Sequence, residues 1–388
     1  MTPRGGAFSL RAMDRQAEWI DRTDELERAL RGLATGPLAV DTEADSLHHY
    51  PEKVCLIQLS FGDRDYLIDA LAGLSLEPLA ERLRDRSIVK VLHGADYDLR
   101  MLHRGFGVTF EGLFDTMIAA RIVGETRFGL AALLEQQFGV PMDKRFQRAD
   151  WSLRPLTPDM ARYAAMDTRY LIPLYEKLHA RLEELARRGW AAEEFKRLEG
   201  IRVRPQPGSD DGFRRVKGAR KLSPQALGVL REIWSLRETY AVKLDRPPFR
   251  ILHDEVLIEL SERVPQRAEE LETIKKLPRP WRQGGRAGEL VAAIRRGRSA
   301  EPPEWPAQAK RGRSRGSVKP TDERVAAIKK HRDQVAKQLG MEPALLGPRA
   351  VLEKLVERLE DGRDPAGTPD LRRWQWELLA PATDKMPG

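Results

Sequence analysis

Residues 38–43, Leu-Ala-Val-Asp-Thr-Glu, form an apolar run that ends in two acids separated by one residue. The run predicts a β-strand with a buried start, and because strand side chains alternate in direction, Asp41 and Glu43 should point the same way. Two like charges about 4 Å apart repel by ~1 kcal/mol in water and by ~4 kcal/mol at an effective dielectric near 20. The end of this strand therefore needs either open solvent or a cation.

The surrounding pattern predicts an α/β domain. The tight-turn pair Gly62-Asp63 joins two of the β-type runs and predicts an antiparallel hairpin, and alternating helices and strands follow it. Such an order calls for a mixed sheet with helices on its faces. The expected strands are 38–43, 54–60, 65–69, 88–92 and 113–115, and the expected helices are 21–32, 76–85, 97–103, 116–123, 129–138 and one long helix from Pro158 to about Arg188.

Further acids are candidates for the same site as Asp41 and Glu43. Asp98 follows the carboxyl end of strand 88–92, where α/β sheets usually place their sites. Asp167 lies on the long helix, with Tyr163 one turn earlier on the same face. Carboxylate ligands suit Mg²⁺ or Mn²⁺, and two such ions about 3.5–4 Å apart can clamp both oxygens of a phosphodiester cleavage. Taken singly, each acid is more often a helix cap or a solvated residue than a metal ligand.

Charge and composition divide the chain into parts. Residues 1–200 contain 28 Lys and Arg against 32 Asp and Glu, whereas residues 201–388 contain 39 against 27. A basic half indicates a polyanion partner such as nucleic acid, or alternatively a solubilising surface. We expect the α/β domain over 1–200, a linker over 201–220, a helical domain over 221–298, a basic Pro/Gly-rich linker over 299–320 and a second helical domain over 321–388.

Several function classes are disfavoured. There is no Cys-x-x-Cys zinc motif, no Gly-x-Ser-x-Gly elbow and no Gly-Lys-Ser/Thr phosphate loop. The single cysteine, Cys55, lies in an apolar run and predicts a core residue. No run of apolar residues could span a bilayer and no signal peptide is evident, so we expect a cytoplasmic protein without membrane partners.

Five strings resemble bacterial ribonuclease D, in the tyrosine branch of the DEDD exonucleases, over about residues 17–190. They are Val-Asp-Thr-Glu-Ala-Asp-Ser-Leu (40–47), His-Gly-Ala-Asp-Tyr-Asp-Leu (93–99), Leu-Phe-Asp-Thr (113–116), Ala-Asp-Trp-Ser-Leu-Arg-Pro-Leu (149–156) and Tyr-Ala-Ala-Met-Asp (163–167). The resemblance implies a ribonuclease H-like exonuclease fold with a mixed five- to six-stranded sheet.

The same resemblance implies a role for each residue. Asp41 would bridge two divalent metal ions, Glu43 and Asp167 would complete the site of the attacking water, and Asp98 would serve the second metal. Tyr163 would orient or deprotonate the nucleophile, and a phenol pKa near 10 favours orientation. Substrate-side candidates are Thr42, His93, Asp115, Gln147, Asp150, Trp151 and Arg154. Asp115 also suits a structural role, and local packing is an equal alternative for the last four.

Residues 246–252 (Arg-Pro-Pro-Phe-Arg-Ile-Leu) and 271–274 resemble an HRDC domain, and 321–380 resemble a second, divergent copy. The resemblance implies two small all-α HRDC-type domains that grip structured RNA, or that pack on the catalytic domain. The expected protein is a monomeric 3′-to-5′ exoribonuclease that releases nucleoside 5′-monophosphates from RNA 3′ ends, especially tRNA precursors, with Mg²⁺ or Mn²⁺. The alternatives are a DNA exonuclease, a general RNA-degrading relative or a non-catalytic RNA-binding protein.

Overall fold

The computed structural model describes residues 15–33, 36–203, 209–305 and 322–383. The chain forms two compact units. The first contains the described residues up to Glu43, then Val54–Val203 and the helices after Arg313. The second contains Ala44–Lys53 together with the described residues of 204–312. Most of the basic Pro/Gly-rich linker expected at 299–320 lies outside the described residues.

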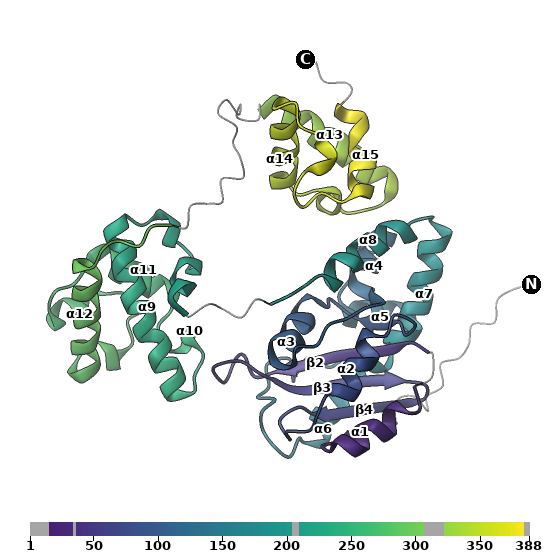
Figure 1. The fold of residues 1–388 in the computed structure, drawn as a ribbon, viewed down its shortest axis with the longest axis horizontal. Helices are drawn as coiled ribbons and strands as arrows, with labels where there is room; N and C mark the ends of the chain where they lie inside the picture. Colours follow the sequence, from purple (N-terminus) through teal and green to yellow (C-terminus); the bar gives the residue numbers. More distant parts are fainter. Residues whose placement is uncertain (1–14, 34–35, 204–208, 306–321, 384–388) are drawn as a thin grey trace, which may run out of the picture. The chain divides into compact units, whose positions relative to one another are not determined.

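The first unit is built on a six-stranded sheet in the order β1-β4-β3-β2-β5-β6 (Figure 1). Strands β3 and β4 are antiparallel, whereas β1–β4, β2–β5 and β5–β6 are parallel pairs. The predicted mixed sheet and hairpin are therefore confirmed. Strand β1 was not predicted, because three residues carry too little periodicity. The strands are β1 (Glu18–Ile20), β2 (Leu38–Ala44), β3 (Val54–Phe61), β4 (Arg64–Asp69), β5 (Lys90–Leu92) and β6 (Leu113–Asp115).

Helices surround this sheet. They are α1 (Thr23–Leu30), α2 (Glu77–Arg84), α3 (Asp96–Phe106), α4 (Thr116–Val123), α5 (Leu130–Phe138), α6 (Pro158–Arg169), α7 (Leu171–Glu184) and α8 (Arg188–Glu199). Helix α6 packs on β3 and β4, and α7 packs on β5. The prediction of one long helix after Pro158 is wrong, because the chain breaks at Tyr170. Pro173, in the first turn of α7, has no N–H to donate to the carbonyl of Arg169, so the helix cannot continue.

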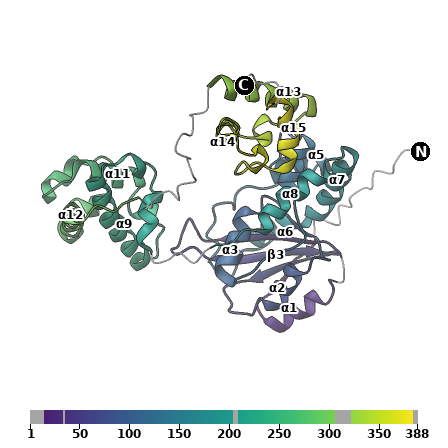
Figure 2. The ribbon, with the colours of Figure 1, turned by 45° about the horizontal axis from the view of Figure 1, so that its top comes forward.

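The last helices of the chain also belong to the first unit. Helices α13 (Asp322–Leu339), α14 (Arg349–Glu360) and α15 (Arg373–Thr383) gather in a small bundle with its own apolar core (Figure 2). Short 3-10 helices η6 (Pro343–Leu346) and η7 (Pro365–Gly367) join them. Trp374 stacks on Trp190 of α8 with ring centroids 5.1 Å apart. The guanidinium of Arg187 donates to the carbonyls of Ile122 and Leu339 at 2.7 and 2.8 Å.

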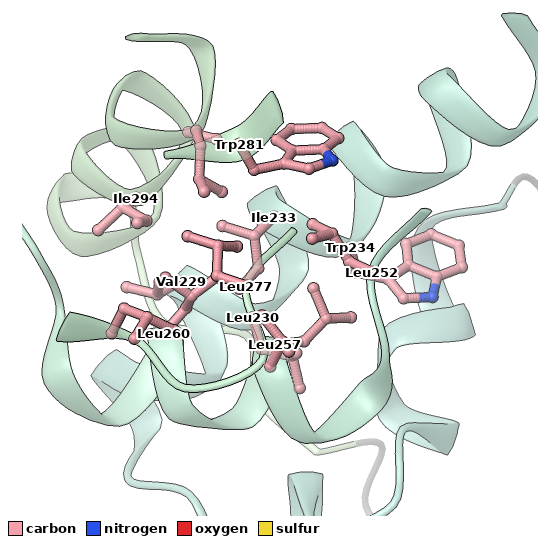
Figure 3. Packing of buried hydrophobic residues seen from close by; sticks show 14 of the residues in the cluster. Val229, Leu230, Ile233, Trp234, Leu252, Leu257, Leu260, Leu277, Trp281 and Ile294 are labelled. Atoms are coloured by element: carbon pink, nitrogen blue, oxygen red, sulfur yellow. The ribbon is translucent and has the colours of Figure 1, made fainter. Parts of the chain in front are cut away.

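The second unit is a helical module. Its elements are η2 (Ser209–Arg215), η3 (Ala219–Lys221), α9 (Pro224–Leu244), α10 (Pro248–Ile251), α11 (Asp254–Arg263), η4 (Ala268–Thr273), η5 (Arg279–Trp281) and α12 (Gly284–Ser299). Residues such as Leu230, Ile233, Leu260 and Trp281 point toward one another in its core (Figure 3).

Part of the expected linker 201–220 belongs to that core. Phe213 and Val216 are buried with the residues of α9, so this stretch folds with the helices that follow. Its Gly and charged residues had indicated a loop, but the aromatic ring of Phe213 anchors it. Within the described residues, no helix has both the length and the apolar character that crossing a membrane requires.

Candidate active site

Strand β2 presents the first two acids. Leu38, Ala39 and Val40 are fully buried and hold the strand in the sheet. Beyond them Asp41 and Glu43 are partly exposed, whereas Thr42 between them is buried. The alternation predicted from the sequence thus places both carboxyl groups on one face of the strand.

Helix α3 supplies the third acid. Asp98 is buried in the first turn, and the hydroxyl of Thr42 donates to its Oδ1 at 2.5 Å. The same Thr42 that separates the two acids of β2 therefore holds the acid of α3 in place. Thr42 was predicted as a substrate-side residue, and in the structure its side chain is buried and bound to Asp98.

Helix α6 supplies the fourth acid and the phenol. Asp167 is buried near the end of the helix, and Tyr163 lies one turn earlier. The ring of Tyr163 contacts the rings of Phe146 and Trp151, with centroid distances of 5.8 and 5.9 Å. Burial and the neighbouring carboxyl groups, Asp167 first, raise the pKa of Tyr163 above its usual 10. In this environment the phenol stays protonated and can orient a ligand by donating a hydrogen bond.

The four carboxyl groups interact with one another. Burial raises the pKa of Asp41 well above its ordinary value, and Asp98, Asp167 and Glu43 raise it further. Burial, then Asp167 and Asp98, raise the pKa of Glu43 to about 9. Burial raises the pKa of Asp98 to about 6, and burial followed by Asp98 raises that of Asp167 to about 7. The structure thus gathers acids from β2, α3 and α6 into one electrostatic cluster, which a cation would stabilise.

The donor set is of the right type for a hard divalent cation, because all four groups are carboxylates. In the described part of the chain, however, no group of three or more His, Cys, Asp or Glu side chains already has the geometry to hold a metal ion. The four acids therefore interact with one another but are not arranged as the ligands of one ion.

Two further predicted residues support the start of α3. Asp115 is buried and accepts hydrogen bonds from the backbone N–H groups of Gly94, Ala95, Met117 and Ile118 at 2.8–3.1 Å. It therefore caps α4 and fixes the turn that leads to Asp98. Nδ1 of His93 lies 2.9 Å from the hydroxyl of Thr116, and burial lowers the pKa of His93 to about 4, so the ring is neutral near pH 7.

The loop before α6 holds the remaining predicted residues. Gln147 is exposed, and Asp150 accepts from the backbone and hydroxyl of Ser152. Trp151 is almost fully buried. Nε and Nη2 of Arg154 donate to the two carboxylate oxygens of Asp69 at 2.8 and 2.6 Å. Nη2 also donates to the carbonyl of Cys55, and Nη1 donates to those of Trp151 and Leu153. In this structure Trp151 and Arg154 hold the loop on the sheet.

Sequence reasoning missed one group of residues beside Asp167. Ser60, Asp65, Thr168 and Arg169 form a buried polar cluster between the sheet and the end of α6. The only signal in the sequence is the pair of acids Asp65 and Asp69, which bracket an apolar strand. Their partners lie about a hundred residues away and could not be identified from spacing.

Comparison with known proteins assigns the family. The sequence pattern described as 3′-5′ exonuclease matches residues 17–183, and the HRDC domain pattern matches 226–294. A ribonuclease D of Pseudomonas paraeruginosa is 33% identical over 95% of this chain and 96% of its own length. This chain belongs to the ribonuclease D family. A second member, from Jannaschia, is 35% identical over 78% of this chain and 79% of its own length.

The fold agrees with this family assignment. The structure of Escherichia coli RNase D, described as an exoribonuclease involved in structured RNA processing, superposes with a TM-score of 0.70. It is 27% identical, and the match covers 95% of this chain and 98% of that one. As a ribonuclease D, the chain is a 3′-5′ exoribonuclease, and the first helical module is the predicted HRDC domain. The second HRDC-like copy, at 321–380, stays a prediction.

Proposed function

We propose that this ribonuclease D releases nucleoside 5′-monophosphates from RNA 3′ ends, using two divalent metal ions held among Asp41, Glu43, Asp98 and Asp167. The observation that carries the proposal is that β2, α3 and α6 bring these four acids into one cluster, in which burial and neighbouring carboxyl groups raise the pKa values of Asp41, Glu43 and Asp167. Four acids that repel one another are unfavourable for a folded protein unless a cation neutralises them. Perturbed groups of this kind cluster at functional sites.

Each residue would then perform a definite task. The metal ions, when bound, would supply the positive charge that activates water and stabilises the leaving oxygen. Asp41 and Glu43 face one side of β2 and would hold them together with Asp167. Thr42 fixes the carboxyl group of Asp98 by its hydrogen bond. Tyr163, protonated and in contact with two aromatic rings, would orient the attacking water rather than remove its proton.

The proposed substrates are RNA 3′ ends, including those of tRNA precursors. We also propose that the protein acts as a monomer and that it acts in the cytoplasm. All of the candidate residues come from one chain. Two alternatives remain to be tested against this proposal. A DNA exonuclease would accept a strand without 2′-hydroxyl groups, and these groups are what separates RNA from DNA at a protein site. A non-catalytic RNA-binding protein would bind the same RNA without shortening it.

The test is digestion of a 5′-labelled RNA by the full chain with Mg²⁺, with Mn²⁺ or with a chelator, and with a matched DNA strand. We expect a ladder that shortens from the 3′ end and a nucleoside 5′-monophosphate product, both of them lost in chelator. Shortening of the DNA strand at the same rate as the RNA would favour the DNA exonuclease. Bound but intact RNA in every metal would favour the non-catalytic RNA-binding protein.

The matching variant is Asp41→Asn. The rate of hydrolysis should fall by about 10³-fold or more, as expected when a metal site is lost. RNA binding, measured in a filter assay, should stay near the wild-type value. Asp96→Asn is the control, because Asp96 lies on the same helix as Asp98 but forms an exposed ion pair with Arg100. Undiminished turnover in Asp41→Asn would contradict the assignment.

A further inference from the structure

A buried ion pair lies directly beside the candidate metal ligand of α6. Oδ2 of Asp65 on β4 accepts from Nε of Arg169 at 2.8 Å, and both side chains are at most 1% exposed. Nε of Arg15 lies 3.0 Å from the same oxygen, and the backbone carbonyl of Arg15 accepts from Arg169 at 2.6 Å. The exonuclease reaction as described above uses none of these groups.

A second polar contact lies one residue closer to the site. The hydroxyl of Ser60 on β3 donates to Oδ1 of Asp65 at 2.7 Å and lies 2.7 Å from the hydroxyl of Thr168. Thr168 and Ser60 are both buried. The cluster therefore ties two neighbouring strands to two consecutive residues of α6.

Those two residues immediately follow Asp167. Successive residues of an α-helix are about 100° apart around its axis, so contacts at two adjacent positions fix both its rotation and its height on the sheet. Once Thr168 and Arg169 are bound to β3 and β4, the direction of Asp167 is determined. Tyr163, four residues earlier on the same face, is set by the same rotation.

We propose that Asp65 and Arg169 are positioning residues of the exonuclease site, which set the rotation of α6 and so place Asp167 and Tyr163 against β2. This inference rests on the proposed function, since it assumes that Asp167 helps to hold a metal ion. Arg15 extends the same anchor to the segment before β1. A buried arginine at the end of a helix also interacts favourably with the helix dipole, which suits Arg169 to this place.

The first measurement is the affinity of the full chain for Mn²⁺ without RNA. Titration calorimetry, at a temperature well below unfolding, gives this affinity. Asp65→Asn should weaken Mn²⁺ binding about 10- to 100-fold, the range seen when groups that orient metal ligands are removed. Arg169→Lys keeps the positive charge, so its Mn²⁺ affinity should fall less than tenfold. Ser60→Ala should lower the Mn²⁺ affinity by a similar factor. For each folded variant, kcat on a short RNA should drop more than KM rises.

The controls separate a positioning role from a general loss of stability. Glu18→Gln breaks an ion pair with Arg64 that is exposed on the same edge of the sheet, and should leave Mn²⁺ affinity unchanged. If Asp65→Asn does not fold, Arg169→Lys and Ser60→Ala still test the inference. The positioning inference would be wrong if the folded variants unfolded at lower temperatures but kept the Mn²⁺ affinity and the kcat of the wild type.

The design also separates this inference from the proposed function. If the wild type binds no Mn²⁺, or if Asp167→Asn binds it as well as the wild type, the metal proposal fails and the positioning inference fails with it. If Asp167→Asn loses Mn²⁺ while Asp65→Asn and Arg169→Lys keep it, only the positioning inference is wrong.

Discussion

Glu43 shows what a single residue contributes to the site and what it costs the fold. Its carboxyl group lies near those of Asp98 and Asp167, and burial with this repulsion raises its pKa to about 9. Without a cation, this group works against the folded state near pH 7, because folding makes the carboxyl group take up a proton that it does not hold in the unfolded chain. Sites assembled for binding often reduce stability in this way.

Glu43→Gln should therefore stabilise the metal-free protein. We expect a gain of about 1–3 kcal/mol in the free energy of unfolding near pH 7, because glutamine needs no proton to be neutral and each pKa unit is worth about 1.4 kcal/mol. The unfolding temperature should rise by several degrees. Calorimetry in chelator measures it, with exposed Glu27→Gln as the control. Added Mg²⁺ should stabilise the wild type and leave the variant unchanged. A lower unfolding temperature for Glu43→Gln in chelator would contradict the interpretation.

Lys90 is a second residue whose charge opposes its surroundings. It is fully buried at the start of β5, and its Nζ donates to the carbonyls of Asp85 and Ile88 at 2.5 and 2.6 Å. Burial lowers the pKa of Lys90 to about 8. Because this value lies below the ordinary 10.5, the unfolded chain binds more protons between pH 8 and 10.5. The contribution of Lys90 to the free energy of unfolding therefore rises with pH in that window.

Comparison of the wild type with Lys90→Met measures this contribution. The difference in the free energy of unfolding, wild type minus variant, should grow by about 1–3 kcal/mol as the pH is raised from 8 to 10.5. Urea unfolding at successive pH values gives the curve, and Lys144→Met, at an exposed lysine, should give a flat difference. Parallel curves for wild type and Lys90→Met would show that the lysine is not buried as described.

At the scale of elements, local rules predicted most of what positions the site. Strand alternation placed Asp41 and Glu43 on one face, and the spacing of four placed Tyr163 above Asp167. Two elements were missed for physical reasons. Strand β1 is too short to show a pattern, and its place is set by pairing with β4. The break after α6 follows from Pro173, which the apolar periodicity of the surrounding residues obscured.

Contacts between distant elements could not be predicted. For Arg154 the sequence left a substrate-side role and local packing equally open, and in the structure the Arg154 side chain donates to Asp69, eighty-five residues earlier. The buried pair of Asp65 and Arg169 is separated by 104 residues. Neither partner can be chosen from sequence spacing, because only the folded sheet brings the two segments together.

Asp115 joins two elements, and its removal should loosen both. Asp115→Ala deletes the acceptor for four backbone N–H groups at the starts of α3 and α4. We expect a loss of about 1–3 kcal/mol in urea unfolding, since one helix cap is typically worth about 1 kcal/mol and buried N–H groups would be left unpaired. Asp143→Ala, at an exposed residue that binds its neighbour Arg145, should change stability by under about 0.5 kcal/mol. Equal losses in the two variants would refute the capping role.

At the scale of the whole molecule, each compact unit has a buried tryptophan in its core. Trp374 lies in the first unit and stacks on Trp190, whereas Trp281 lies in the core of the second unit. Replacing either by alanine leaves a large cavity, which typically costs about 3–5 kcal/mol. The two residues therefore report on two different cores.

Calorimetry of the intact chain should resolve two unfolding transitions. Trp374→Ala should lower the temperature of one of them and Trp281→Ala that of the other, because the cores are distinct. Mg²⁺ should raise only the transition that Trp374→Ala lowers, since all candidate metal ligands are in that unit. A single transition that both variants shift equally would show that the chain unfolds as one body.

The first unit is assembled from segments that are separated in the chain, and this has a consequence for its synthesis. A ribosome delivers β1 to α8 early and α13 to α15 last, with the HRDC domain between them. During that interval the nascent chain holds Trp190 without Trp374, and the guanidinium of Arg187 without the carbonyl of Leu339. Translation speed across the HRDC segment therefore sets how long an incomplete nuclease waits for its final helices.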